Sequence, residues 1–211
     1  MANFDRTVED LGNIVCLEHV NTSVPDQQLA TTFYIMGLGL TRDPYIMTGT
    51  NNMWINVGRA QFHLPSGNAQ VLRGTSGIVI EGREALLQRL NDVAPTLKDT
   101  KFSVTEHNDY VAVTCPWGNQ IRCHEPSPEF GQIRLGMPYV SFDVPVGSTG
   151  AIARFYEEII GTSATTGEDG GTAITSVAAG DGQKLVFRET SAPPADYDGH
   201  HVAVYLADFS G

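Results

Sequence analysis

IVCLEHVN, at residues 14–21, is the stretch of sequence that decides the fold. It reads as a β-strand, and Pro25 and Asp26 behind it are typical of a helix start. Apolar residues at helical spacing follow and two glycines end the element: Leu29, Phe33 and Met36, then Gly37 and Gly39. The stretch therefore predicts a strand that leads directly into a short helix.

A second strand and helix follow the same plan at residues 139–161. The run YVSFDVPV at 139–146 is strand-like, Ser148 is a suitable N-cap and Gly161 closes the helix. The apolar stripe of this helix consists of Ile152, Phe155, Tyr156, Ile159 and Ile160. The Phe-Tyr pairs of the two helices are 122 residues apart, and each Phe precedes a glycine by six residues. This shared offset indicates two copies of one strand–helix unit.

Short strand-like runs follow each predicted helix. They lie at 45–48, 53–57 and 60–64 after the first helix, and at 163–166, 172–178 and 184–189 after the second. A weaker unit lies between them, with a strand at 75–80, a helix at 83–93 and strands at 102–106, 110–115 and 119–125. The order β-α-β-β-β is therefore predicted three times.

Residues 201–208 begin like a fourth unit. His201 precedes Asp208 by seven residues, just as His19 precedes Asp26, and each histidine is followed by valine. The helix of this unit would begin near Ser210. A first strand without its partners leaves backbone groups unpaired. The pattern therefore predicts a fragment, a truncated product or a chain that a partner completes.

The composition limits the classes of partner. The chain has 211 residues, of which 41% are hydrophobic and 18% charged, so a packed core is expected. A net charge of -11 with only 13 Lys and Arg argues against nucleic-acid binding. There is no apolar run of membrane-spanning length and no secretory signal at residues 1–10. The three cysteines (Cys16, Cys115 and Cys123) lack a C-x-x-C spacing, which favours reduced thiols and a cytoplasmic location.

Three patterns carry a family resemblance. The first is His19-Val20 with Asp26 and the Phe-Tyr-x4-Gly helix behind it. The second is RGTSGI at 73–78, which is similar to a Gly-His-Ile-Ala-Leu module start. The third is CPWGNQIR at 115–122, which is similar to an Asp-Pro-Asp-Gly-Asn-x-Ile-Glu turn and strand. In this order they resemble the vicinal-oxygen-chelate superfamily of glyoxalases, bleomycin-resistance proteins and extradiol dioxygenases.

The resemblance implies an α+β fold in which paired βαβββ modules form a curved, mixed-sheet cup. It implies one complete domain at 13–126, a linker at 127–136 and a partial second domain at 137–211. Family members hold a divalent metal in the cup, here Fe, Mn, Zn or Ni, which binds two neighbouring oxygens of a small-molecule substrate. The habit of the family also implies a homodimer.

Carried over by position, two of the family's metal ligands fit. His19 takes the first-strand position and His63 takes the position at the end of the first module, where Glu is common. The second module departs from the pattern, with Thr75 and Arg122 at its ligand positions. Arg122 repels a cation, so it is a candidate for binding an anionic substrate. His124 stands two residues further along the same strand and is a substitute ligand.

The third and fourth modules give one further ligand. Ser141 departs from the pattern, whereas His201 fits it, and Trp117 is a candidate for lining the mouth of the cup. A strand histidine can equally be structural. Strand alternation places Glu18 on the face opposite His19, and it turns His200 and His201 to opposite faces.

Two functional hypotheses of different classes stay open, beside the third that the chain is an inactive, truncated scaffold or dimer partner. The first is a metal-dependent dioxygenase, lyase or isomerase that acts on a small oxygen-rich molecule. The second is a metal-free protein that sequesters a small anionic or aromatic ligand, which the departures at Thr75, Ser141 and Arg122 favour. Catalytic residues are not identified by the sequence.

Overall fold

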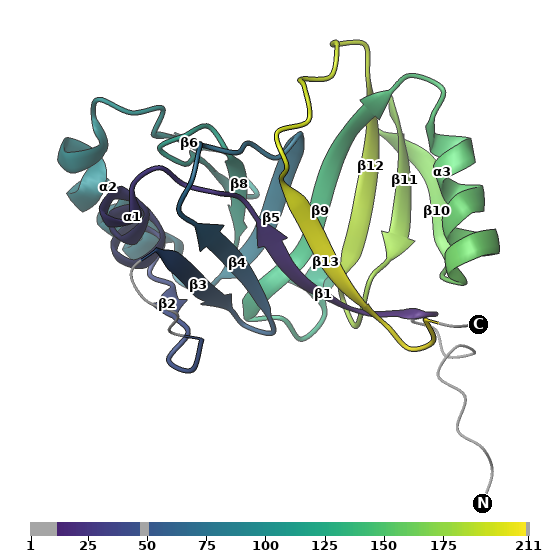
Figure 1. The fold of residues 1–211 in the computed structure, drawn as a ribbon, viewed down its shortest axis with the longest axis horizontal. Coiled ribbons are helices and arrows are strands. Elements are labelled where there is room, and N and C mark those ends of the chain that lie inside the picture. Colours follow the sequence, from purple (N-terminus) through teal and green to yellow (C-terminus); the bar gives the residue numbers. More distant parts are fainter. Residues whose placement is uncertain (1–11, 47–50, 210–211) are drawn as a thin grey trace, which may run out of the picture.

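The structure, a computed structural model, describes residues 12–46 and 51–209. The strands form a five-stranded and an eight-stranded sheet, with helices at both ends of the molecule (Figure 1). The order of one strand, one helical segment and three strands occurs three times, and a single strand follows. This is the α+β, mixed-sheet architecture that the sequence predicted.

The five-stranded sheet has the order β13-β1-β4-β3-β2. Its members are β1 (Ile14–Asn21), β2 (Thr41–Arg42), β3 (Asn52–Val57), β4 (Ala60–Pro65) and β13 (His201–Leu206). The first strand, β1, lies between β4, to which it is parallel, and β13, to which it is antiparallel. The predicted fourth-module strand is therefore next to the first strand of the chain.

The eight-stranded sheet has the order β10-β11-β12-β9-β5-β8-β7-β6. Its members are β5 (Gly74–Ile80), β6 (Ser103–Glu106), β7 (Val111–Thr114), β8 (Gln120–His124), β9 (Leu135–Pro145), β10 (Ala164–Asp169), β11 (Thr172–Ala178) and β12 (Lys184–Thr190). The antiparallel pair β5–β9 joins the second and third units into one sheet. The two predicted domains therefore both contribute strands to this sheet, and the division between them stays a prediction.

The first helical segment consists of α1 (Gln27–Ala30) and η2 (Thr31–Gly37), a π-helical turn. As expected, Asp26 caps it, because its Oδ1 accepts hydrogen bonds from the backbone of Gln28 and Leu29 at 2.7 and 3.0 Å. Helix α2 (Arg83–Leu97) packs on η2. The third segment, α3 (Thr149–Phe155) and η4 (Tyr156–Ile160), packs on β10–β12 and ends at Gly161, whose φ is 75°.

Strand alternation gives the five-stranded sheet one buried and one open face. Along β3, Met53, Ile55 and Val57 are buried, and the residues between them are partly exposed. The buried face meets the helices, since Tyr34 of η2 lies 5.2 Å from Phe62 of β4 between ring centroids. The opposite face carries His63 and the other half-exposed side chains of β4. Within residues 12–46 and 51–209, no helix is long and apolar enough to cross a membrane.

Two expected strand boundaries were wrong. Residues 45 and 46 are not in a strand, because Asp43 accepts hydrogen bonds from both of their backbone N–H groups and forms a turn, while β2 lies earlier. Residues 47 and 48 of that expectation, and the helix start near Ser210, lie outside the described residues. Strand β9 begins at Leu135, four residues before the predicted start. The expected linker contains a short 3₁₀ helix, Pro128–Phe130, which is fixed by the burial of Phe130.

Candidate functional site

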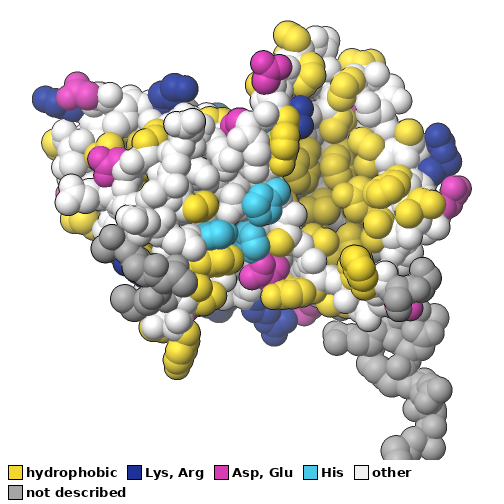
Figure 2. All heavy atoms as spheres, viewed as in Figure 1, with side chains coloured by type: hydrophobic (Ala, Val, Ile, Leu, Met, Phe, Trp, Pro, Cys, Tyr) yellow, Lys and Arg dark blue, Asp and Glu magenta, His cyan; other side chains and the backbone are white. Residues whose placement is uncertain are grey.

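Three histidines meet on the open face of the five-stranded sheet. His19 is on β1, His63 on β4 and His201 on β13, and the strand register places Asn21 of β1 opposite both His63 and His201. The ring centroid of His19 lies 5.5 Å from that of His63 and 5.8 Å from that of His201. We call these residues the histidine cluster. Figure 2 shows histidine side chains gathered on this face.

Trp54 forms one wall of the histidine cluster. Its ring is stacked on His63 with centroids 3.7 Å apart and an interplanar angle of 11°, and it meets His19 edge-on at 5.0 Å. Trp54 was not among the candidates predicted from the sequence. Strand alternation could have found it, because the hairpin β3–β4 pairs Trp54 directly with His63.

Glu18 binds the imidazole next to it in sequence. Its Oε2 accepts a hydrogen bond from Nδ1 of His19, so the expectation that Glu18 faces away was wrong. The physical reason is a β-bulge between Leu17 and His19, which breaks the alternation of the strand. The remaining nitrogen of His19, Nε2, is buried and has no hydrogen-bond partner in the described part of the chain.

His63 is held as a neutral imidazole. Its Nε2 lies 2.6 Å from Asn52 Oδ1, so Nε2 carries the proton and Nδ1 keeps its lone pair. Burial, together with the neighbouring His19 and His201, lowers the pKa of His63 to about 4. A neutral imidazole is the form that binds a metal ion.

His124 does not join the histidine cluster. It lies on β8, in the eight-stranded sheet, where its Nε2 is 2.9 Å from the hydroxyl of Tyr139 and its ring contacts Tyr110 and Phe130. Burial lowers the pKa of His124. His124 thus contacts residues of the eight-stranded sheet, whereas His19 and His63 lie in the five-stranded sheet, and its role as a ligand stays a prediction.

The other candidates also lie in the eight-stranded sheet or at its edge. Arg122 of β8 lies over the ring of Tyr110, with 4.9 Å from Cζ to the centroid. Trp117, in the turn before β8, packs against the core. Thr75 and Ser141, which depart from the family pattern, stand opposite each other in the β5–β9 pair. Of the two adjacent histidines near the end of the chain, His200 is buried and bonded to Asp198, and His201 is exposed, as alternation predicted.

The side chains of the histidine cluster are of a type that binds metal ions, but their geometry is not that of a formed metal site. Its three imidazoles are donors typical of Zn, Ni and Fe sites. The buried and unpartnered Nε2 of His19 is a donor atom whose orientation Glu18 already fixes. Among the described residues, however, no group of three or more His, Cys, Asp or Glu is arranged to hold a metal ion. Of the three imidazoles, His19 is therefore the one whose free nitrogen is best placed to bind a metal ion.

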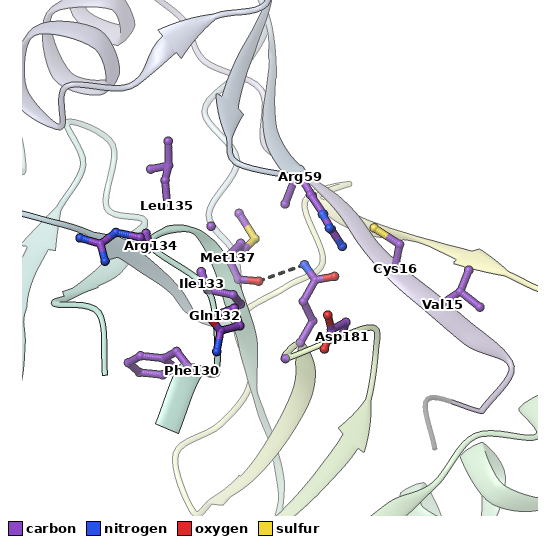
Figure 3. Close-up of a pocket in the computed structure, with 15 residues that line it drawn as sticks. Val15, Cys16, Arg59, Phe130, Gln132, Ile133, Arg134, Leu135, Met137 and Asp181 are labelled. Atoms are coloured by element: carbon purple, nitrogen blue, oxygen red, sulfur yellow. Dashed lines mark hydrogen bonds between the residues drawn. The ribbon is translucent and has the colours of Figure 1, made fainter. Parts of the chain in front are cut away.

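A cavity of about 410 Å³ lies between the two sheets. Figure 3 shows Arg59, Cys16 and Asp181 around it, together with the segment that leads into β9. Gln183 closes one side: its Oε1 accepts from Leu17 N at 3.1 Å, and its Nε2 donates to Met137 O at 3.1 Å. We call this the junction cavity. Burial and the Glu18 carboxylate raise the pKa of the Cys16 thiol, and Arg59 lowers it.

Comparisons with known proteins identify the fold through solved structures. No family model matches the chain, and no curated protein does. The chain is similar to glyoxalase I from Zea mays, at 12% identity and a TM-score of 0.58, over 90% of this chain and 72% of the other. It is also similar to a proposed dioxygenase from Bacillus subtilis, at 17% identity and a TM-score of 0.53, over 92% and 68%. Similarities at these identities establish the fold alone.

Proposed function

We propose, from the vicinal-oxygen-chelate fold of this chain, that the histidine cluster holds a divalent metal ion and binds a small oxygen-rich molecule. The observation that supports this most directly is Nε2 of His19, which is buried, unpartnered within the described residues and surrounded by two further imidazoles. A buried ring nitrogen without a partner costs free energy. A metal ion would remove that cost.

Each imidazole would offer one defined nitrogen. Glu18 accepts a hydrogen bond from Nδ1 of His19 and leaves Nε2 free, whereas Asn52 accepts a hydrogen bond from Nε2 of His63 and leaves Nδ1 free. Such outer partners fix the ring orientation and raise the basicity of the donor atom. The exposed His201, at the rim, is the third donor.

A bound metal would supply Lewis acidity to two neighbouring oxygens of the ligand, as dioxygenase, lyase and isomerase chemistry requires. The chain itself orients the imidazoles of His19 and His63 through Glu18 and Asn52 and leaves His201 open to solvent. Trp54 covers one face of His63, so water reaches that ring only from its other side and edges. We therefore propose a metal-dependent enzyme of this class.

Metal content in two matched variants tests the proposal. Untagged protein is incubated with Fe²⁺, Mn²⁺, Zn²⁺ or Ni²⁺, desalted and analysed by mass spectrometry. The native chain and His124→Ala should retain about one metal ion per chain, and His19→Ala should bind at least about tenfold more weakly. Equal metal content in all three proteins contradicts the proposal, because removal of His19 then affects metal binding no more than removal of His124.

A metal-free binding function is the second candidate, and the junction cavity favours it. The cavity contains Arg59, which has no ion pair within residues 12–46 and 51–209, so it is available to an anionic ligand. Benzoate and inorganic phosphate serve as probes in thermal unfolding. A rise in Tm that is lost in Arg59→Gln and unchanged by a chelator supports this candidate. A rise that the chelator abolishes supports the metal site.

A further inference from the structure

The eight-stranded sheet carries an exposed arginine that no carboxylate neutralises. Arg122 of β8 is exposed and forms no ion pair within residues 12–46 and 51–209. Arg188 of β12, in the same sheet, shows the usual alternative, since its Nη1 lies 2.5 Å from Oδ2 of Asp169. The charge of Arg122 is therefore available to a ligand, whereas the charge of Arg188 is already used within the protein.

Strand register places Arg122 in one row with Gly77 and Tyr139. Arg122 of β8 pairs with Gly77 of β5, and Gly77 pairs in turn with Tyr139 of β9 (Figure 1). Because Gly77 has no side chain, the ring of Tyr139 lies against its backbone, and a Cβ there would lie 2.3 Å from that ring. The hydroxyl of Tyr139 thus reaches across β5 to β8, where it meets His124.

Hydrogen bonds and a ring contact fix the position of the guanidinium. Arg122 donates to the hydroxyl of Tyr139, and this hydroxyl lies 2.9 Å from Nε2 of His124. Burial lowers the pKa of His124, so its imidazole is neutral at pH 7 and accepts a hydrogen bond from the hydroxyl. The guanidinium also lies over the ring of Tyr110, with 4.9 Å between Cζ and the centroid. Arg122 is thus oriented by groups that leave its charge uncompensated.

Two hydroxyl groups stand next to this row. Thr75 of β5 pairs with Ser141 of β9, and each lies two residues along its strand from the row, hence on the same face and about 7 Å away. Both side chains are partly exposed, and neither hydroxyl is engaged by another group of the described residues. Hydroxyl groups and a guanidinium are donors that bind the oxygens of carboxylates and phosphates.

Charged groups of both signs lie around these residues. The carboxylates of Glu129 and Asp109 act electrostatically on His124, and Glu129 acts on Tyr139 as well. Neither carboxylate is in an ion pair within the described residues. Lys184 of β12 pairs with Tyr139, so it extends the same row on the other side. The two carboxylates oppose the binding of an anion here, and removing one of them should therefore strengthen it.

We propose that Arg122, Thr75 and Ser141 form a second binding site, which takes the carboxylate or phosphate group of a small anion. We call these residues the arginine site. The guanidinium binds two oxygens of the anion, and the hydroxyls donate to the oxygens that remain. The arginine site belongs to a different sheet from the histidine cluster and does not depend on metal binding there. It is also distinct from the junction cavity, whose unpaired arginine is Arg59.

Titration of the full, metal-stripped chain, followed by the NMR shifts of its amides, tests the proposal. Inorganic phosphate and acetate are the probes, and they distinguish a phosphate ligand from a carboxylate ligand. At least one of them should cause saturable shifts at residues 75–77, 120–124 and 139–142. Arg122→Gln removes the charge but keeps hydrogen-bond donors, and it should weaken binding at least about tenfold. Arg188→Gln is the matched control, and it should bind as the native chain does.

Two further variants distinguish the arginine site from other anion sites. Glu129→Gln should tighten binding by roughly twofold, because it removes a neighbouring negative charge. Arg59→Gln should leave binding unchanged, and a loss of binding in this variant assigns the anion to the junction cavity and overturns the proposal. Failure of both probes to saturate, or equal binding by the native chain and Arg122→Gln, also overturns it. Circular dichroism verifies that every variant folds.

Discussion

The imidazoles of His19 and His63 lie edge to face, with centroids 5.5 Å apart and an interplanar angle of 89°. They are 44 residues apart in sequence, and the parallel pairing of β1 with β4 brings them together. In this arrangement the edge of one ring faces the surface of the other. Side chains on a rigid sheet keep their relative positions, so a ligand would meet a site that is largely formed beforehand.

Trp54 should report metal binding by its fluorescence. It is one of two tryptophans in the chain, and it is stacked on His63 at 3.7 Å. Ni²⁺ quenches nearby indoles, so titration with Ni²⁺ should remove most of the Trp54 emission. We expect the effect to persist in Trp117→Phe and to vanish in Trp54→Phe. Loss of quenching in Trp117→Phe instead would move the metal to the eight-stranded sheet.

The stability of the protein should depend on pH through His63. Its pKa is near 6.5 in the unfolded chain and about 4 in the folded protein. Between these values the unfolded state binds a proton that the folded state does not, so stability falls as the pH falls from 6.5 to 4. The loss should be roughly 1–2 kcal/mol after solvent screening.

Urea unfolding at pH 7 and pH 4.5 measures this loss. The variant His63→Gln keeps a polar side chain but cannot titrate, so its midpoint should decline less than that of the native protein. Protonation of carboxylates at low pH also lowers the free energy of unfolding. This effect is the same in both proteins, so it cancels in the comparison. An identical decline in the two would assign the pH dependence to other groups.

The sequence predicted the elements that local signals define. The Asp26 cap, the Gly161 end and the alternation of β3 and β4 gave the correct segments, because each depends on neighbours within a few residues. The positions of His19, His63 and His201 followed from the spacing of similar units. Together they gave the fold class and the principal candidates of the site.

The remaining features depend on contacts that no local pattern encodes. The bulge that turns Glu18 toward His19 is a property of the β1–β13 register. His124 lies in the other sheet from His19 because β8 pairs with β5, across 39 residues of intervening sequence. Such long-range pairings determine which strands share a sheet. For that reason local patterns could place His19, His63 and His124 on strands but could not say which of these strands share a sheet.

Gln183 should contribute strongly to stability. It is 9% exposed and makes hydrogen bonds to both N and O of Leu17 in one sheet and to O of Met137 in the other. Removing its amide breaks three buried hydrogen bonds to the backbone, so Gln183→Ala should cost about 2–4 kcal/mol. Chemical denaturation measures this cost. Gln132→Ala is the control, because Gln132 borders the same cavity but is exposed, and it should cost under about 0.5 kcal/mol.

Gly77 should tolerate no side chain while Tyr139 is in place. A Cβ on Gly77 would lie 2.3 Å from the Tyr139 ring, so Gly77→Ala displaces that ring and its hydrogen bond to His124. We expect a loss of about 1–3 kcal/mol in unfolding free energy. In Tyr139→Ala the ring is absent, so adding Gly77→Ala to that variant should cost under about 0.5 kcal/mol. Chemical denaturation of both single variants and the double variant gives the coupling between the two sites. Additive losses would show that Gly77 is needed for the backbone conformation of β5, and that the ring of Tyr139 is not what excludes a side chain there.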